Sequence, residues 1–496
     1  MKRIIIISIL SFLSCVSFAQ SYELNLSATM LKNQGELKKG ADVHLNRILL
    51  SNTLNDSEIK QCYLLLDDKG NKLELTSKFK DCFEFRYDNP QELWDGHIIT
   101  HVLDDLVDKG FQYNLRSEME EDALEYIQRV KNYGLEFYDP YMESYIYSLI
   151  TKIAPTRLID GRPGSINLLI QSNSTVNACC YPNGTIVLNT GLLAALHSED
   201  ELVAILAHEI AHFILDHSVQ NVNAAISRQK RAEFWAAVAT GMTAFAEGFA
   251  ASQGNYYTPG LATLGMAAMS TSIASKVLDR LGMKYNHKQE KEADELAVEV
   301  LKLLGYDENA LASALSNIHD SFINEKNYTL YFDSETHPNI RKRIRAVGSP
   351  QAIFDKQYER AISFAVTDVA KMKYDARRYT QCIQHVNLNI ENNVATADDY
   401  LLKANCILYT KDNEDAYNEV LDLIEKARLI NPQNLNICKT EIIATLRIKD
   451  IHKSLQLLNQ YIEQLDAYIQ AQLGADDFFF TEIEWAKNMI IKLKGM

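Results

Sequence analysis

The segment His208-Glu209-Ile210-Ala211-His212 constrains this chain more than any other feature. An α-helix advances about 100° per residue, so histidines four positions apart lie on one face and both imidazoles can reach one metal ion. Glu209 is rotated toward the flank, where its carboxylate can act as general base on a zinc-activated water. The pattern therefore predicts a centre with one Zn2+ per chain that hydrolyses peptide bonds.

The residues around this segment bear on whether it binds a metal. Ser198-Glu199-Asp200-Glu201 has the form of a capping box, which predicts the start of the helix. Polar side chains that are desolvated inside such a helix need partners. The apolar surround consists of Leu202, Val203, Ile205, Leu206, Ile210, Phe213 and Ile214. The alternative is that both histidines are hydrogen-bonded core residues without a metal.

Two histidines do not complete a zinc site, so a third protein ligand is needed. One class of zinc peptidase places a histidine ten positions after the first, with a glycine three before it. Those positions are Ser218 and Leu215 in this chain, which excludes that class. His217 is offset by one position, and we expect it to point elsewhere.

A glutamate on a later helix is the remaining choice, and the candidates are Glu233 and Glu290. A zinc-bound histidine normally donates its other ring nitrogen to a carboxylate. Glu290 has Asp294 four residues on, whereas Glu233 has an alanine at that spacing. We therefore predict Glu290 as the metal ligand and Asp294 as the supporting acid. Glu292 competes locally but would face about 200° away from Glu290, and a solvated acidic helix face is the alternative for the pair.

The first nineteen residues have the pattern of a secretory signal. Lys2 and Arg3 precede a short apolar run, and Ser17-Phe18-Ala19 resembles a cleavage site. We expect residues 1–19 to be a signal peptide and the protein to be periplasmic or otherwise extracytoplasmic, with a membrane anchor as the alternative. The formal net charge of −15 is spread along the chain, which argues against nucleic acid or an anionic membrane surface as the main partner.

The remaining patterns predict an α+β protein of several domains. Residues 20–115 read as a small β-rich domain, in which Cys62 and Cys82 could pair in an oxidising compartment. Residues 116–350 are predicted to form a mainly helical zincin-type peptidase domain with a small edge sheet. Within them, the charge-poor residues 234–280 favour a helical hairpin packed on the core over a transmembrane hairpin.

Residues 355–496 are predicted to be helical throughout. Residues 401–409 and 416–430 read as an antiparallel helix pair, and the second helix ends before Asn431-Pro432. This pair resembles a tetratricopeptide-type repeat, which has about 34 residues per unit. A plain helical bundle is the alternative.

Four blocks of sequence together resemble the metallopeptidase family of HtpX, the CaaX prenyl proteases and the periplasmic BepA-like proteases. The resemblance covers about residues 135–350. The blocks are Asn177-Ala178 with Pro182-x-Gly184-x-Ile186 through Leu192, then Glu201 to His212, then Glu290 to Asp294, and finally Thr336-His337-Pro338 with Arg343-Ile344.

The resemblance implies roles for residues outside the histidine motif. It matches Glu290 to the ligand glutamate and Asp294 to the acid behind a ligand histidine. It also implies an edge strand beside the cleft, where an extended peptide substrate can add by β-pairing. That strand would carry Thr185, Ile186 and Val187.

His337 and Arg343 match a loop near the zinc, and the resemblance adds both to the predicted catalytic set. Such a histidine can bind or shield the metal in a resting state, or steady the oxyanion. A buried loop histidine and a salt-bridged structural arginine are the alternatives.

Soluble members with a signal peptide and a C-terminal helical repeat act in envelope protein quality control. The resemblance therefore implies a zinc endopeptidase for misfolded or misassembled envelope proteins, with polypeptides as substrates. The C-terminal helices would recruit substrates or an envelope assembly machine, and the chain could associate with a membrane without spanning it. The competing hypothesis is a catalytically degenerate repeat scaffold or chaperone-like protein, against which the intact site residues argue. An integral-membrane prenyl-peptide protease would need several spans that the sequence does not predict.

Overall fold

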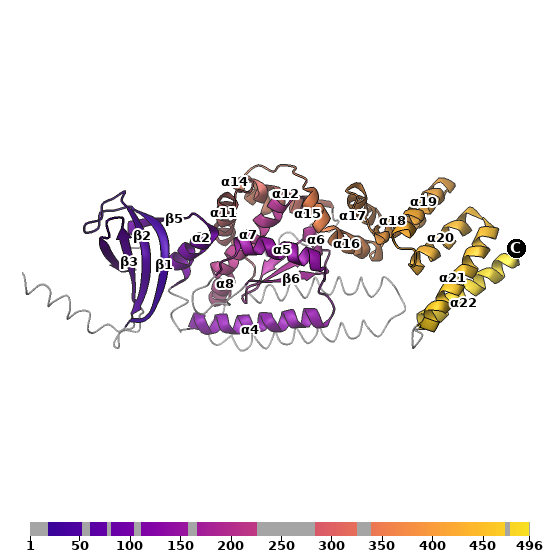
Figure 1. Ribbon diagram of the computed structural model, residues 1–496, viewed down its shortest axis with the longest axis horizontal. Helices are drawn as coiled ribbons and strands as arrows, with labels where there is room; N and C mark the ends of the chain where they lie inside the picture. Colours follow the sequence, from indigo (N-terminus) through magenta and orange to yellow (C-terminus); the bar gives the residue numbers. More distant parts are fainter. Residues whose placement is uncertain are drawn as a thin grey trace, which may run out of the picture.

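Figure 1 shows an elongated molecule in which an N-terminal sheet, a central mixed region and a C-terminal array of helices follow one another. The computed structural model describes residues 18–51, 60–76, 81–103, 111–156, 166–225, 283–324, 339–471 and 477–495. Several predictions lie outside these ranges. They concern most of the signal peptide 1–19, the candidate ligand Glu233, the hairpin 234–280 and the loop with His337.

The N-terminal region is a five-stranded antiparallel sheet of order β4-β3-β2-β1-β5. Its strands are β1 (Phe18–Met30), β2 (Asp42–Ser51), β3 (Lys60–Asp67), β4 (Lys72–Thr76) and β5 (Phe83–Arg86). Every second residue of β1 from Leu24 to Met30 is buried, because one face of the sheet is covered. A tight turn joins β3 to β4, where Asp67 accepts hydrogen bonds from the backbone N–H groups of Lys69 and Asn71. Cys62 and Cys82 are free thiols.

Helix α2 (Pro90–His97) runs into the π-helical turn η2 (Ile98–Val102) and joins the sheet to the central region. Asn89 caps α2 by accepting the N–H of Glu92 at 3.0 Å. Trp94 is fully buried, and its indole N–H donates to the carbonyl of Ile153 at 2.7 Å. Apolar residues of the sheet, of α2 and of α5 (Pro140–Ile153) form one continuous core. The sheet is therefore packed onto the central region.

The central region consists of helices around a small sheet. Besides α5 its elements are α4 (Phe111–Asn132), β6 (Asn167–Gln171), β7 (Ala178–Cys180), β8 (Thr185–Asn189), α6 (Thr190–Leu193), α7 (Glu199–Ile214), α8 (His217–Ala225), α11 (His287–Leu304), α12 (Ala310–Asn324) and α14 (Ile340–Val347). Helix α7 is almost entirely buried and packs against α11, α12 and β7. The helix start predicted at Ser198 is confirmed, because Ser198 caps α7, and Asp139 caps α5 in the same way.

The order of the central sheet corrects the predicted edge strand. The order is β6-β8-β7, so β8, which carries Thr185, Ile186 and Val187, is the middle strand. It pairs in parallel with β6 and antiparallel with β7. Both sides of β8 are therefore occupied, and an extended peptide cannot add to it. The edge strand that contacts α7 is β7.

The first turn of α7 contains a buried acid. Glu201 is 1% exposed and accepts hydrogen bonds from the backbone N–H of His197 at 2.7 Å and from the side-chain amide of Asn317 on α12 at 3.0 Å. Burial raises the pKa of Glu201 to about 7, although the hydrogen bonds oppose that shift. In the predicted capping box, the Glu201 carboxylate would accept the backbone N–H of Ser198. It accepts that of His197 instead.

Two helices after residue 355 belong to the central core. They are α15 (Lys356–Ala361) and α16 (Ser363–Asp375), whose residues Tyr358, Ile362, Ala365, Val366 and Val369 are buried in it. The Tyr358 hydroxyl donates to the carbonyl of Leu193 at 2.8 Å. Asp368 accepts hydrogen bonds from the hydroxyls of Ser172 and Thr190, both at 2.9 Å. The predicted domain boundary at 350–355 therefore divides this core.

The C-terminal array consists of stacked helical hairpins. It continues through α17 (Tyr379–Glu391), α18 (Ala397–Thr410), α19 (Glu414–Ile430), α20 (Leu435–Ile448), α21 (Ile451–Ala471) and α22 (Asp477–Lys494). Each helix packs on the next, and α18 also contacts α16 and α20. Helices α16, α18 and α20 begin at residues 363, 397 and 435, so they are offset by 34 and 38 residues. The predicted pair within 401–430 corresponds to α18 and α19, and the tetratricopeptide identity of the array stays a prediction.

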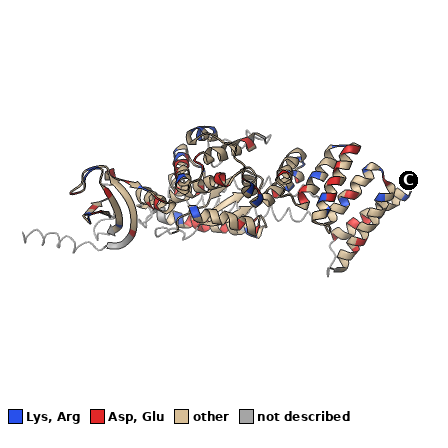
Figure 2. Ribbon diagram, turned by 45° about the horizontal axis from the view of Figure 1, so that its top comes forward, with Lys and Arg blue, Asp and Glu red and all other residues tan. Residues whose placement is uncertain are grey.

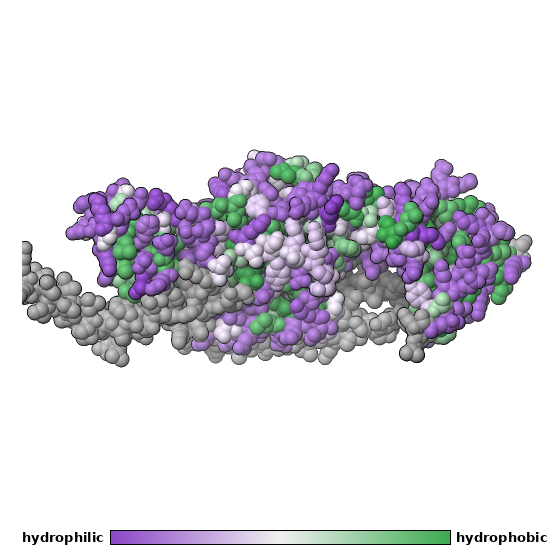
Figure 3. All heavy atoms as spheres, in the orientation of Figure 1, coloured by the Kyte–Doolittle hydropathy of each residue, from purple (hydrophilic) through white to green (hydrophobic). Residues whose placement is uncertain are grey.

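The surface of the array mixes charges with exposed apolar side chains. Figure 2 shows basic and acidic residues interspersed along its helices, and Figure 3 shows hydrophobic surface between hydrophilic stretches on the same helices. Exposed apolar residues there include Tyr409, Leu429 and Ile491. In the described ranges no single helix has the length and composition of a membrane span, whereas α7 and α8 together meet those two criteria as a pair bent by 47°.

Candidate metal centre

Helix α7 presents both histidines of the motif to one point. His208 and His212 are 2% and 0% exposed, and their Nε2 atoms lie 3.1 Å apart. Their rings are nearly perpendicular, with centroids 4.6 Å apart. Burial holds the pKa of His212 well below its usual range, so its imidazole is neutral and keeps a lone pair for a metal.

Helix α11 brings the third predicted ligand to the same point. Asn286 and Gln289 form a reciprocal capping box that fixes the start of α11. Glu290, in its first turn, places Oε2 3.8 Å from Nε2 of His208 and Oε1 3.5 Å from Nε2 of His212. One ligand atom from each of the three residues lies within 4.8 Å of the others. Atoms bound at about 2.0–2.1 Å around a tetrahedral zinc lie about 3.3–3.4 Å apart, so this donor set fits Zn2+.

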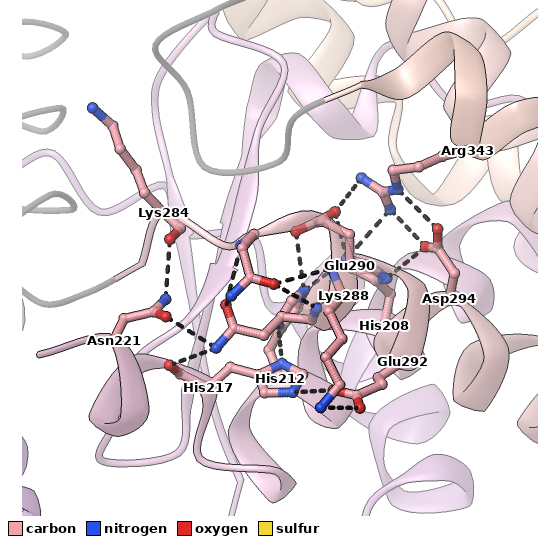
Figure 4. A network of polar contacts seen from close by, with 12 residues as sticks. His208, His212, His217, Asn221, Lys284, Lys288, Glu290, Glu292, Asp294 and Arg343 are labelled. Carbon is pink, nitrogen blue, oxygen red and sulfur yellow. Dashed lines mark hydrogen bonds and ion pairs between the residues drawn. The ribbon is translucent and has the colours of Figure 1, made fainter. Parts of the chain in front are cut away.

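Asp294 lies behind the first histidine. Its Oδ1 is 3.0 Å from Nδ1 of His208, and Arg343 of α14 binds it through Nε at 2.8 Å and Nη2 at 2.6 Å (Figure 4). Burial alone would raise the pKa of Asp294, but the Arg343 guanidinium and His208 outweigh it, so the pKa lies below the usual range. Asp294 is therefore a carboxylate that can hold the ring of His208 with Nε2 toward the metal.

Arg343 also contacts the carboxylate of Glu290. Its Nη1 lies 2.5 Å from Oε2 of Glu290, and its Nη2 is 3.4 Å from Nε2 of His208. The guanidinium thus contacts two buried carboxylates, those of Glu290 and Asp294, and the charge of the buried Glu209 acts on it as well. Unbalanced charge is costly in a buried site, and a divalent cation would bring this cluster close to neutrality.

Glu209 is 2% exposed and follows His208 in α7. Its charge acts on Arg343, on Cys179 of β7 and on Tyr285, so it lies in the same buried space. Burial, with that charge as a smaller contribution, raises the pKa of the Cys179 thiol, so Cys179 stays protonated. A buried carboxylate next to a metal site is the arrangement that general-base catalysis needs.

Two residues of the site have roles that the sequence did not predict. His217 does not join the ligand set, yet its Nδ1 lies 2.8 Å from Nδ1 of His212. Tyr285 stacks on the His212 ring with centroids 3.6 Å apart and ring planes 14° apart. His217 reaches this position because α7 ends at Ile214 and the chain turns through Asp216, whose φ is 56°. A helix continued straight would carry His217 away, so spacing alone gave no signal for the contact.

Comparison with known proteins also indicates a metallopeptidase. Residues 143–351 match the model of peptidase family M48. The chain is 26% identical over 196 residues to the beta-barrel assembly-enhancing protease of Escherichia coli (strain K12), which is 39% of this chain and 36% of that protein. It is 24% identical over 197 residues to the protein of that name from Yersinia pestis, which is 39% of this chain and 36% of that protein.

A third relative is a mitochondrial protein. The mitochondrial metalloendopeptidase OMA1 of Schizosaccharomyces pombe is 27% identical over 174 residues, which is 35% of this chain and 43% of that protein. The chain therefore spans less than half the length of each of these curated relatives. The matched region contains both histidines of the motif, Glu290, Asp294 and Arg343. The resemblance predicted from the four sequence blocks is confirmed, because residues 143–351 match the model of this metallopeptidase family.

Proposed function

We propose that this protein is a zinc-dependent endopeptidase that cleaves misfolded or misassembled proteins of the cell envelope. The observation that carries the proposal is the buried convergence of His208, His212 and Glu290 beside Glu209. Three protein ligands leave a position open for water or substrate, which is typical of catalytic rather than structural zinc sites.

Each residue of the site has a proposed task. His208, His212 and Glu290 would hold one Zn2+ per chain. When bound there, zinc lowers the pKa of water and polarises a carbonyl group. Glu209 takes the proton of the attacking water and delivers it to the leaving amine. Asp294 orients His208, and its support is expected to raise metal affinity.

Arg343 and His337 complete the proposed catalytic set. The guanidinium of Arg343 contacts Glu290 and Asp294, which supports a role in orienting the ligand and balancing its charge. We propose that His337, which lies outside the described residues, shields the metal or steadies the oxyanion. If an extended substrate pairs with the sheet next to α7, the strand available for pairing is β7.

The setting and partners are proposed from the relatives and from the layout of the chain. Relatives of the peptidase region carry the name beta-barrel assembly-enhancing protease. Together with the signal-like residues 1–19, this supports an extracytoplasmic location and envelope polypeptides as substrates. The hairpins from α17 to α22 would recruit substrates or an envelope assembly machine, in the manner of helical repeats. Nucleic acid is not expected as a partner, and any association with a membrane would be peripheral rather than spanning.

The test combines metal analysis with proteolysis. The purified chain is expected to contain one zinc and to digest casein, and a strong chelator should remove both zinc and activity. Glu209→Gln should keep zinc and fold but lose turnover, because the carboxamide cannot accept the proton. Digestion that survives complete metal removal, or a Glu209→Gln variant with full activity, would refute the proposal. A zinc-loaded wild-type chain without any proteolysis would favour a degenerate scaffold.

A further inference from the structure

The outer nitrogens of the two ligand histidines face different partners. Asp294 lies directly against Nδ1 of His208, at 3.0 Å. Nδ1 of His212 instead faces Nδ1 of His217 at 2.8 Å, and Nε2 of His217 lies 3.4 Å from Oε2 of Glu292 (Figure 4). His217 is 1% exposed, whereas Glu292 reaches the surface and pairs with Lys288 at 3.5 Å. A chain of polar contacts therefore runs from the second ligand histidine to the edge of the protein.

Hydrogen-bond chemistry fixes the direction of this chain. Two ring nitrogens 2.8 Å apart form a hydrogen bond only if one carries a proton and the other a lone pair. His212 must keep the lone pair of Nε2 for the metal, so its proton is on Nδ1. His217 then accepts at Nδ1 and carries its own proton on Nε2, which faces Glu292. The Glu292 carboxylate can only accept, so it selects this tautomer of His217.

The backbone around His217 has few alternative positions. His217 begins α8 immediately after Asp216, which is held by a buried ion pair with Arg116 of α4. Gln289 of α11 donates to the backbone carbonyl of His217 at 3.3 Å and to Asn221 Oδ1 at 3.0 Å, which ties α8 to α11. These contacts fix the backbone of His217, and its imidazole lies between His212 and Glu292.

We infer that His217, backed by Glu292, is a positioning residue that holds His212 in the tautomer and orientation that bind the metal. The inference rests on the proposed zinc site and deepens it. Helix α11 would then support every ligand, because it supplies Glu290 itself, Asp294 behind His208, and Glu292 behind His212 through His217. Tyr285 adds a stacking face that fixes the plane of the His212 ring.

Variants of the full-length chain separate hydrogen bonding from packing. His217→Phe keeps a ring of similar size but has no acceptor. His217→Asn places an acceptor oxygen near the position of Nδ1 and gives up the ring. Glu292→Gln weakens the outer contact, and Glu295→Gln is the matched control, because Glu295 lies on the same helix and pairs with the exposed Lys291 at 3.3 Å.

The readouts are zinc affinity from competition with a chromogenic chelator and the absorption spectrum of the Co2+-loaded protein, with circular dichroism as a check of folding. His217→Phe should bind zinc about 10–100-fold more weakly. His217→Asn should stay much closer to wild type, Glu292→Gln should show a smaller loss, and Glu295→Gln should show none. The Co2+ spectrum should shift in the phenylalanine variant, because His212 is no longer held in one orientation.

Two results would overturn the inference. One is a folded His217→Phe variant with wild-type zinc affinity. The other is a folded His217→Asn variant as weak as His217→Phe, which would mean that ring packing is the cause. If the wild-type chain binds zinc but cuts no protein, the proposed function fails and the inference stands. If the wild-type chain binds no zinc, both fail.

Discussion

Removing the C-terminal helices tests how far the central core extends. A chain that ends at residue 354 lacks α15 and α16, which bury five apolar side chains in that core, namely Tyr358, Ile362, Ala365, Val366 and Val369. Burying a large apolar side chain contributes roughly 1.5–3 kcal/mol, so the four larger ones contribute about 6–12 kcal/mol as an upper estimate. The total stability of a domain is about 5–15 kcal/mol. We therefore expect this truncated chain to be unfolded or insoluble, without bound zinc.

A chain that ends at residue 393 is the matched control. It keeps α17, whose Cys382 and Val386 cover the outer face of α16 at Ala370, and whose Asn389 donates to the carbonyl of Ser363 at 2.9 Å. We expect this longer chain to fold, bind zinc and cut short peptides, but to handle protein substrates poorly. Circular-dichroism melting and metal content of both chains decide the question. A cooperatively folded, zinc-loaded chain ending at 354 would show that α15 and α16 are dispensable and that the reasoning from burial is wrong.

Further variants test the site and its surroundings. Glu290→Ala should abolish tight zinc binding, Asp294→Ala should weaken it about 10–100-fold, and Glu233→Ala should leave it nearly unchanged, as measured by metal content. Arg343→Ala leaves two buried carboxylates without their cation, so urea titration should show a loss of about 3–5 kcal/mol in unfolding free energy. The pKa of Glu201 is raised to about 7, so the folded state holds its proton more tightly than the unfolded state. Its contribution to stability is then largest below about pH 4.5 and is lost as pH rises through about 7, so Glu201→Gln should gain stability relative to wild type between about pH 5 and pH 8. A pH-independent difference in melting temperature would contradict that assignment.

Local patterns account for the parts of the site that the sequence predicted. Two histidines four residues apart share a helix face wherever that helix lies, and the same spacing rule pairs Glu290 with Asp294. The helix starts at Asp139 and Ser198 depend on side chains next to the caps, so they too could be read from the sequence. Each of these features involves residues within one turn of each other.

Features set by tertiary contacts could not be read in this way. A middle strand and an edge strand differ in how many neighbouring strands they pair with, which local sequence does not show. Val187 and Cys179 are both apolar, yet Val187 lies in the middle strand β8 and Cys179 in the edge strand β7. The contact of His217 depends on a left-handed turn at Asp216, and that conformation is held by Arg116, 100 residues earlier in the chain. The predicted boundary at 350–355 rests on local pattern alone, whereas α16 has apolar residues in both the central core and the array.

The metal site and the packing of α7 on α11 depend on each other. The histidines come from α7 and the carboxylates from α11, so the same helix contact that fills the core also sets the distances between ligand atoms. Without a cation, the closely placed carboxylates of Glu290 and Asp294 would repel each other across this interface, and Arg343 offsets only part of that charge. A bound Zn2+ would therefore stabilise the folded state as well as the chemistry, by an amount that grows with the ratio of zinc concentration to dissociation constant. The residues that hold the two histidines in place would then affect both metal affinity and stability. A misplaced His212 would weaken the metal site and, with it, the packing of α7 on α11.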